Sequence, residues 1–138
     1  MKMTATVLAV VALIGQSAAS GAATMTGNAQ HGAVIFKQCA VCHRIGPHAQ
    51  NSVGPVLTGV VGRHAATYPG YSYSSGMKRS GIVWSEAELD KFLHAPRKLV
   101  PGTKMSFVGL QRDQDIADVI AYLMTFGAAA GKTASQSK

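Results

Sequence analysis

The placement of the two cysteines constrains this 138-residue chain more than any other feature. Cys39 and Cys42 lie within one five-residue segment, so no disulfide can tie distant loops together. The chain also has 15 glycines but only four phenylalanines, four tyrosines and one tryptophan, which indicates long loops and a thin apolar core. A chain of this kind needs another component around which to fold.

That component is indicated by the segment Cys39-Ala40-Val41-Cys42-His43, which has the spacing of a c-type haem attachment site. In such sites both sulfurs bond to the porphyrin, and the adjoining histidine binds the iron from one side. The alternatives are a thioredoxin-like dithiol and half of a zinc site. A helical pattern rather than a strand precedes the motif, and there is no second cysteine pair, so haem is favoured.

A haem iron bound by His43 needs a sixth ligand, and Met105 is the best placed candidate. It follows Pro101-Gly102-Thr103-Lys104 in an irregular loop, where a thioether is available to the iron rather than buried by helix periodicity. Met124 is expected to pack on a helix, and the histidines are expected at the surface. The full set of candidates is His48, His64, His94, Met77, Met105 and Met124. Ligation by His43 and Met105 would saturate the iron and favour electron transfer over substrate chemistry.

The first residues have the pattern of a secretory signal peptide. An apolar run at residues 5–14 follows Lys2 and precedes a stretch of small residues at 16–23. The run is about half the roughly 20 residues that a membrane span needs. Three cleavage positions fit, after Ala19, Ala22 or Ala23. We therefore predict a signal peptide at 1–23, a folded domain at 24–126 and a disordered tail at 127–138.

The formal net charge is +7, and it falls to +6 if Lys2 is removed with the signal peptide. A basic exported protein can meet an anionic membrane, a nucleic acid or an acidic protein. The basic residues form no run of five and are not interleaved with stacking aromatics. Nucleic acid is therefore not expected as a partner.

Three helices are predicted. The first begins after Asn28 and runs to about residue 38. The second begins at the capping box that opens with Ser85 and ends before Pro96. The third begins near Asp113 and has an amphipathic period. Residues 44–84 carry many glycines without a sustained period, so mostly irregular structure is expected there.

From residue 27 to residue 126 the chain resembles the class I cytochromes c, and in particular the bacterial cytochrome c2 group. The resemblance rests on the cysteine motif together with Gly54-Pro55, Gly59, Gly62-Arg63, residues 71–74, 81–84, 101–105 and 118–123. It implies an all-α class I cytochrome c fold, in which three to five helices and long loops surround one haem bound covalently through Cys39 and Cys42.

The resemblance also implies how the haem is held. Gly32 and Phe36 should meet Val119 and Tyr122 where the first and last helices cross. The Pro55 carbonyl should bond the distal ring nitrogen of His43. The positions that hold the haem propionates are Arg63, Tyr73, Ser74, Trp84 and Thr103. Two positions depart from the mitochondrial pattern, where Phe92 replaces a tyrosine and Met77 replaces an asparagine, and the loss of these polar groups changes the hydrogen bonding near the iron.

By the same resemblance, positive charge surrounds the exposed haem edge at Lys37, Arg97, Lys98 and Lys104. The implied function is a periplasmic, monomeric one-electron carrier without stable membrane insertion. Its donor would be a cytochrome bc-type complex, and its acceptor a photosynthetic reaction centre or a cytochrome oxidase. The alternatives are a membrane-tethered cytochrome subunit and a haem peroxidase or sensor in which Met105 dissociates.

Overall fold

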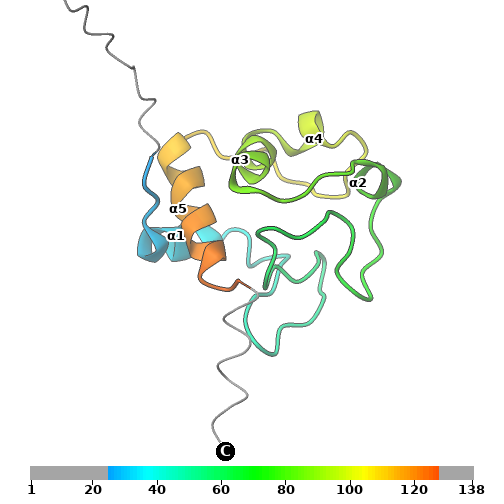
Figure 1. Ribbon diagram of the computed structural model, residues 1–138, viewed down its shortest axis with the longest axis horizontal. Coiled ribbons are helices and arrows are strands. Elements are labelled where there is room, and N and C mark those ends of the chain that lie inside the picture. Colours follow the sequence, from blue (N-terminus) through cyan, green and yellow to red (C-terminus); the bar gives the residue numbers. More distant parts are fainter. Residues whose placement is uncertain (1–24, 128–138) are drawn as a thin grey trace, which may run out of the picture.

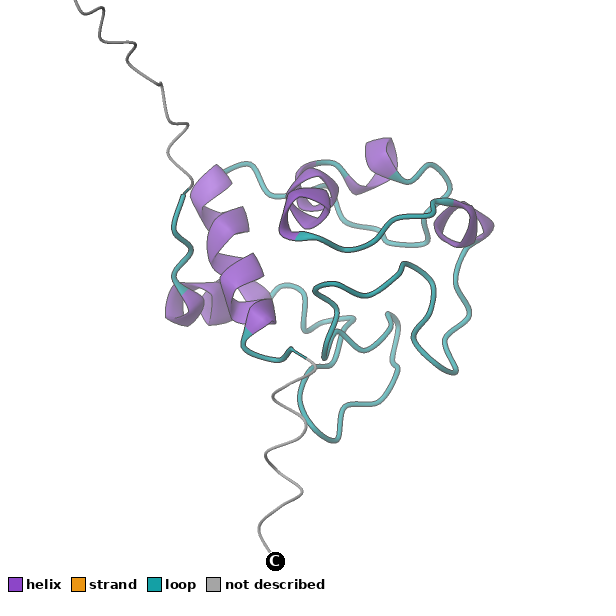
Figure 2. Ribbon diagram, in the orientation of Figure 1, coloured by secondary structure: helices purple, strands orange, loops and turns teal. Residues whose placement is uncertain are grey.

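A computed structural model describes residues 25–127 of the chain as a set of helices joined by long loops (Figures 1 and 2). The helices are α1 (Ala29–Phe36), α2 (Ser75–Arg79), α3 (Glu86–His94), α4 (Pro96–Leu99) and α5 (Asp113–Met124). These residues form no strand, and His64 and Val83 make one isolated bridge. The predicted all-α class is confirmed. The predicted signal peptide, and the predicted tail beyond Gly127, lie outside the described residues.

The first and last helices cross closely, as predicted. Asn28 caps α1 by accepting a hydrogen bond from the backbone N–H of His31 at 3.0 Å. A Cβ atom at Gly32 would overlap the backbone carbonyl of Asp118 on α5, so only glycine allows this approach. The rings of Phe36 and Tyr122 pack with their centroids 5.2 Å apart. The crossing joins two segments that lie about 90 residues apart in the sequence. Figure 1 shows it at one side of the molecule.

Helix α3 packs against α5 and completes the core. Ser85 caps α3 by accepting from the backbone N–H of Glu88 at 3.2 Å, as the capping box predicts. The buried stripe of α3 is Leu89, Phe92 and Leu93. Pro96 ends this helix as expected, but it also begins the short helix α4, because proline fits a first helical turn where no N–H is needed.

The long central segment is more ordered than the sequence indicates. It contains helix α2, whose first turn is capped by Ser74 through a 3.1 Å hydrogen bond from the Met77 N–H. Gly76 on α2 packs directly against the backbone of Pro101. No helix among residues 25–127 is long and apolar enough to cross a membrane. Together with the helical core, the loops enclose a cavity.

Candidate functional site

A cavity of about 390 Å³ lies between the core and the loops, and its lining is mostly apolar. Its volume falls within the range of roughly 300–1,000 Å³ that is usual for ligand sites. The walls come from the end of α1, the 53–77 segment, α3 and the loop before α5. The structure brings together here all ten residues predicted to contact the cofactor: Cys39, Cys42, His43, Pro55, Arg63, Tyr73, Ser74, Trp84, Thr103 and Met105.

The two cysteines lie on a turn that continues directly from α1. The backbone N–H of Cys39 bonds the Phe36 carbonyl at 2.8 Å, and that of His43 bonds the Cys39 carbonyl at 2.9 Å. The thiols are not joined in a disulfide. Burial, with a smaller contribution from Cys42, raises the pKa of the Cys39 thiol to about 11. The attacking cysteine of a dithiol redox site has a lowered thiol pKa, so the surroundings of Cys39 do not favour the thioredoxin-like alternative.

His43 is held in one orientation at the edge of the cavity. Its Nδ1 lies 2.7 Å from the carbonyl oxygen of Pro55, which can only accept, so Nδ1 carries the proton and donates. Burial lowers the pKa of His43, and the bond to Pro55 opposes that shift. A neutral imidazole with its proton on Nδ1 keeps the Nε2 lone pair available to a metal ion.

Gly54 supports that orientation through a close contact with the imidazole. A Cβ atom there would lie 2.5 Å from His43 Cε1 and 2.7 Å from Nδ1. Real side chains do not approach this closely, so residue 54 has to be glycine while the ring stays in place. The backbone of Gly54 also bonds the Cys42 carbonyl at 2.8 Å, which ties this wall to the cysteine turn.

Met105 reaches the cavity from the loop between α4 and α5. Its backbone N–H donates to Oγ1 of Thr103 at 3.2 Å, and the N–H of Thr103 bonds the Val100 carbonyl at 3.1 Å. These bonds give the loop a defined turn just before the methionine. The thioether is half-buried, as expected for a group that meets a ligand rather than the core.

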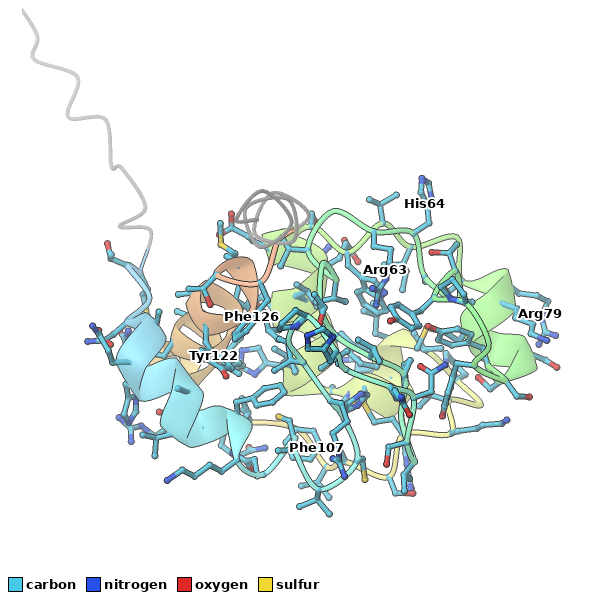
Figure 3. All side chains as sticks on the ribbon, turned by 90° about the horizontal axis from the view of Figure 1, so that it is seen from below. Arg63, His64, Arg79, Phe107, Tyr122 and Phe126 are labelled. Carbon is cyan, nitrogen blue, oxygen red and sulfur yellow. The ribbon has the colours of Figure 1, made fainter. Side chains whose placement is uncertain are left out.

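The other candidates for the sixth ligand are placed less well, with one exception. Met77 also lines the cavity. His64 lies at its border but is exposed, and Figure 3 shows its ring pointing away from the molecule. His48 is exposed, whereas His94 pairs with Asp113 at 3.1 Å.

The expectation that Met124 packs is wrong. Its side chain is 47% exposed, because it belongs to the last turn of α5 and faces solvent there. Met124 does not line the cavity.

Arg63 brings a positive charge to the cavity wall without an acidic partner. Its Nη1 donates to the Thr58 carbonyl at 3.0 Å, and its Nη2 donates to the Val56 carbonyl at 2.9 Å. None of the ion pairs within residues 25–127 includes Arg63. Burial lowers the pKa of Arg63, and Tyr73 and Tyr68 oppose that shift. A half-buried cation of this kind is suited to an anionic ligand group.

Two hydroxyl groups and two aromatic residues complete this part of the wall. Ser74 Oγ and Thr103 Oγ1 each accept from a backbone N–H, so each retains its own proton for donation to a ligand. Trp84 is buried, with its ring centroid 4.9 Å from that of Phe92. Burial raises the pKa of Tyr73, while nearby Arg63 opposes that shift. At neutral pH Tyr73 is therefore a hydroxyl donor.

Taken together, these groups fit a haem. The cavity is apolar, two thiols lie at one edge, and a nitrogen and a sulfur donor reach into it. The positive charge of Arg63 and the hydroxyl donors match the carboxylates that a haem carries. Among the described residues, no group of three or more histidine, cysteine or acidic side chains is arranged to bind a bare metal ion.

The four cationic residues predicted to dock a partner are all exposed. Arg97 and Lys98 are adjacent on α4, and Lys37 follows the last residue of α1. Lys104 differs from them because its Nζ donates to the Ser72 carbonyl at 2.6 Å and it lines the cavity. Its charge is therefore held at the cavity rim, where it links the Met105 loop to the segment that carries Tyr73.

Sequence reasoning missed the role of Asp118. This carboxylate is only 2% exposed and bonds three groups: the Asn28 N–H and Gln114 Nε2, both at 2.7 Å, and His31 Nδ1 at 2.6 Å. The hydrogen bond from Asn28 is the main cause of the lowered pKa of Asp118. The sequence carried one signal for this role: Asp118 is a charged residue directly beside Val119, on the face of α5 that is buried.

Comparisons with known proteins agree with this geometry. The family model described as "Cytochrome c" matches residues 29–127. The chain is 50% identical over 116 residues to cytochrome c2 of Rhodomicrobium vannielii, covering 83% of this chain and 93% of that protein. It is 46% identical over 115 residues to cytochrome c2 of Blastochloris viridis, covering 83% and 91%. Among solved structures, cytochrome cH from Methylobacterium extorquens matches with a TM-score of 0.68 at 43% identity, covering 72% of this chain and 99% of that one.

Proposed function

This chain belongs to the cytochrome c family, and from that membership we propose that it is a periplasmic one-electron carrier. The proposed donor is a cytochrome bc-type membrane complex, and the proposed acceptor is a photosynthetic reaction centre or a cytochrome oxidase. The observation that supports this function best is one apolar cavity onto which Cys39, Cys42, His43 and Met105 all open. The family carries covalently attached haem c, and the two cysteines of this chain are its attachment points.

Within this site the haem iron supplies a reversible exchange of one electron. His43 and Met105 would bind the haem iron, with the Pro55 carbonyl fixing the imidazole through Nδ1. Two protein ligands leave no position open to oxygen or peroxide, which disfavours catalysis on a substrate. The bond to Pro55 and the close contact with Gly54 hold the imidazole of His43 in one orientation, which would limit its rearrangement when the iron gains or loses an electron.

The remaining residues of the wall position and neutralise the cofactor. We assign Arg63, Tyr73, Ser74, Trp84 and Thr103 to the haem carboxylates, because all five line the cavity and each carries an N–H or O–H donor. Arg63 has the strongest support, since it is a half-buried cation whose only described bonds are to backbone carbonyls. A carboxylate beside it would satisfy its remaining donors.

Partner binding is assigned to the exposed cations Lys37, Arg97, Lys98 and Lys104. Positive charge near the cavity would attract an acidic partner and raise the rate of encounter. The proposed contact is small and short-lived, as a carrier that alternates between two partners requires. Export to the periplasm is supported by the apolar run and the small residues at the start of the sequence.

The test compares optical spectra of the oxidised protein, in which sulfur ligation of ferric haem gives a weak band in the red. Wild type should show c-type visible bands together with this red band. Met105→Ala should lose the red band while keeping the haem, because the cysteines still attach it. Met124→Ala is the matched control, since it removes an exposed methionine that does not line the cavity.

A second measurement separates the carrier from a peroxidase or sensor. Wild-type protein should resist cyanide when oxidised and carbon monoxide when reduced, whereas Met105→Ala should bind both readily. Fast binding by the wild type at neutral pH would show that the sixth position is open. The carrier function would then have to be abandoned.

A further inference from the structure

The surroundings of Arg63 include one residue that the proposed function does not use. The centroid of the Tyr68 ring lies 4.9 Å from Cζ of Arg63, which is within the distance for a cation–π contact. Arg63 lines the cavity, but Tyr68 does not. Figure 3 shows Arg63 directed into the body of the molecule. The guanidinium of Arg63 therefore lies between the cavity and the ring of Tyr68, which belongs to the same loop.

The guanidinium of Arg63 makes two kinds of contact within its own loop. Two of its nitrogens donate to the carbonyls of Thr58 and Val56, five and seven residues before it in the chain. Its carbon atom Cζ lies over the ring of Tyr68, five residues after it. The two hydrogen bonds set the direction of the side chain. The ring occupies space next to the charge that water would otherwise fill, and a charge that is less hydrated acts more strongly on its neighbours.

Pairing between backbone segments places this arrangement at the cavity. The N–H of Trp84 bonds the Arg63 carbonyl at 2.9 Å, and the N–H of Ala65 bonds the Ile82 carbonyl at 2.8 Å. Tyr68 follows on the same loop, where Thr67 closes a turn by donating from Oγ1 to the His64 carbonyl at 2.7 Å. The position of Tyr68 thus comes from its loop, and Tyr68 itself does not line the cavity.

We propose that Tyr68 is a positioning residue that raises the reduction potential of this protein by holding the Arg63 charge, dehydrated, at the cavity wall. The inference rests on the proposed function, in which Arg63 faces the haem carboxylates. A positive charge near the iron favours its reduced form, because reduction lowers the charge of the centre by one. Without the ring, water would screen the charge of Arg63, and the oxidised form would become more stable relative to the reduced form.

The experiment is an equilibrium redox titration of the complete haem-loaded protein, in which a mediator of known potential supplies or accepts one electron. Tyr68→Leu removes the ring but keeps an apolar side chain. At a fixed applied potential it should raise the ratio of oxidised to reduced protein about threefold, a shift of roughly 30 mV since tenfold is 59 mV for one electron. Tyr68→Phe retains the ring and should match wild type. Thr67→Ser keeps the hydroxyl that closes the turn at the His64 carbonyl, and it should also match wild type.

A second readout does not depend on the potential. Exchange of the Arg63 Nε–H with water, followed by NMR in the reduced protein, should be faster in Tyr68→Leu and unchanged in Tyr68→Phe. Tyr68→Trp should slow this exchange, because indole attracts cations more strongly than phenol does. This variant also keeps the test valid if the leucine variant does not fold.

Two results would overturn the inference: a Tyr68→Leu protein with wild-type potential and exchange, or a Tyr68→Phe protein that shifts as far as Tyr68→Leu. The second result would assign the effect to the hydroxyl rather than to the ring. Failure of the carrier function would appear separately, as a missing red band in wild-type protein. Failure of this inference would appear only in the comparison of Tyr68 variants.

Discussion

Single residues in this protein owe their importance to the group that they touch. Gly54 contributes no side chain, yet its backbone lies against the imidazole of His43. Pro55 contributes its carbonyl oxygen, which fixes Nδ1 of the same ring. Two adjacent residues thus determine the orientation of a proposed iron ligand, Gly54 by close contact and Pro55 by a hydrogen bond.

Gly54→Ala should disturb this arrangement more than its small size suggests. The added methyl would lie 2.5 Å from Cε1 of His43, so the ring must turn and its bond to Pro55 must lengthen. We expect a loss of about 1–3 kcal/mol in unfolding free energy, typical of overpacking. Thermal unfolding measures this loss, and absorbance of purified protein measures haem loading, which should fall as well. Ser52→Ala, an exposed change two residues away, should leave both unchanged. If Gly54→Ala had wild-type stability, the backbone around residue 54 would have to shift at little energetic cost to make room for the methyl group.

At the scale of elements, the crossing of α1 and α5 joins the two ends of the described chain. Apolar contacts such as Phe36 with Tyr122 supply part of its stability. Asp118 adds a polar connection, because it accepts from the Asn28 backbone just before α1 and contacts His31 within it. A buried carboxylate with three partners is stabilising as long as all three remain, and removing it leaves buried donors unpaired.

Asp118→Asn should therefore destabilise the protein by about 1–3 kcal/mol at neutral pH, because an amide cannot accept at both oxygen positions. The pH dependence should change as well. The pKa of Asp118 is lowered in the folded state, so its contribution is complete above the unfolded value of about 3.9 and is lost as the pH falls through the lower folded value. Denaturant unfolding from pH 7 to pH 2 should show a smaller loss of stability in Asp118→Asn than in wild type.

The control for this experiment is Asp90→Asn, which removes a carboxylate from α3, away from the helix crossing. It should retain most of the neutral-pH stability. If Asp118→Asn and wild type lose the same stability on acidification, acid unfolding arises elsewhere in the molecule.

The whole molecule combines an apolar cavity with a strongly basic surface. The formal net charge of the full chain is +7, and the cations proposed for docking are exposed. Uniform basicity would attract any acidic surface, whereas a docking site requires that particular cations matter more than others. Comparison of individual charge variants distinguishes these possibilities.

Electron transfer to an isolated acidic acceptor complex should slow as salt rises, because salt screens the attraction. Lys98→Gln should lower the second-order rate constant several-fold at low ionic strength and much less at high ionic strength, as measured by flash or stopped-flow kinetics. Arg79→Gln removes one exposed charge from α2, outside the proposed docking set, and should have a smaller effect. Equal effects of the two variants would indicate that only net charge matters. A rate independent of salt would exclude electrostatic docking.

Several features were predictable because their signals are local. The cysteine motif lies within five residues, and the Ser85 cap and the apolar period after Asp113 each lie within one helix. The short helices α2 and α4 escaped prediction because a few residues give no period. Ser74 and Pro96 marked their starts, but a capping residue alone does not show that a helix follows.

The sequence alone determined the haem attachment motif, the three main helices and, in part through a family resemblance, ten of the residues that line the cavity. Tertiary structure alone decided that Asp118 would be a buried junction, that Lys104 would bond Ser72, and that Tyr68 would cover Arg63. The physical reason is that helix caps and periods depend on neighbours in the chain. The partners of a buried charge or an aromatic face depend on which segments the fold brings together, and for Asp118 and Asn28 those segments are 90 residues apart.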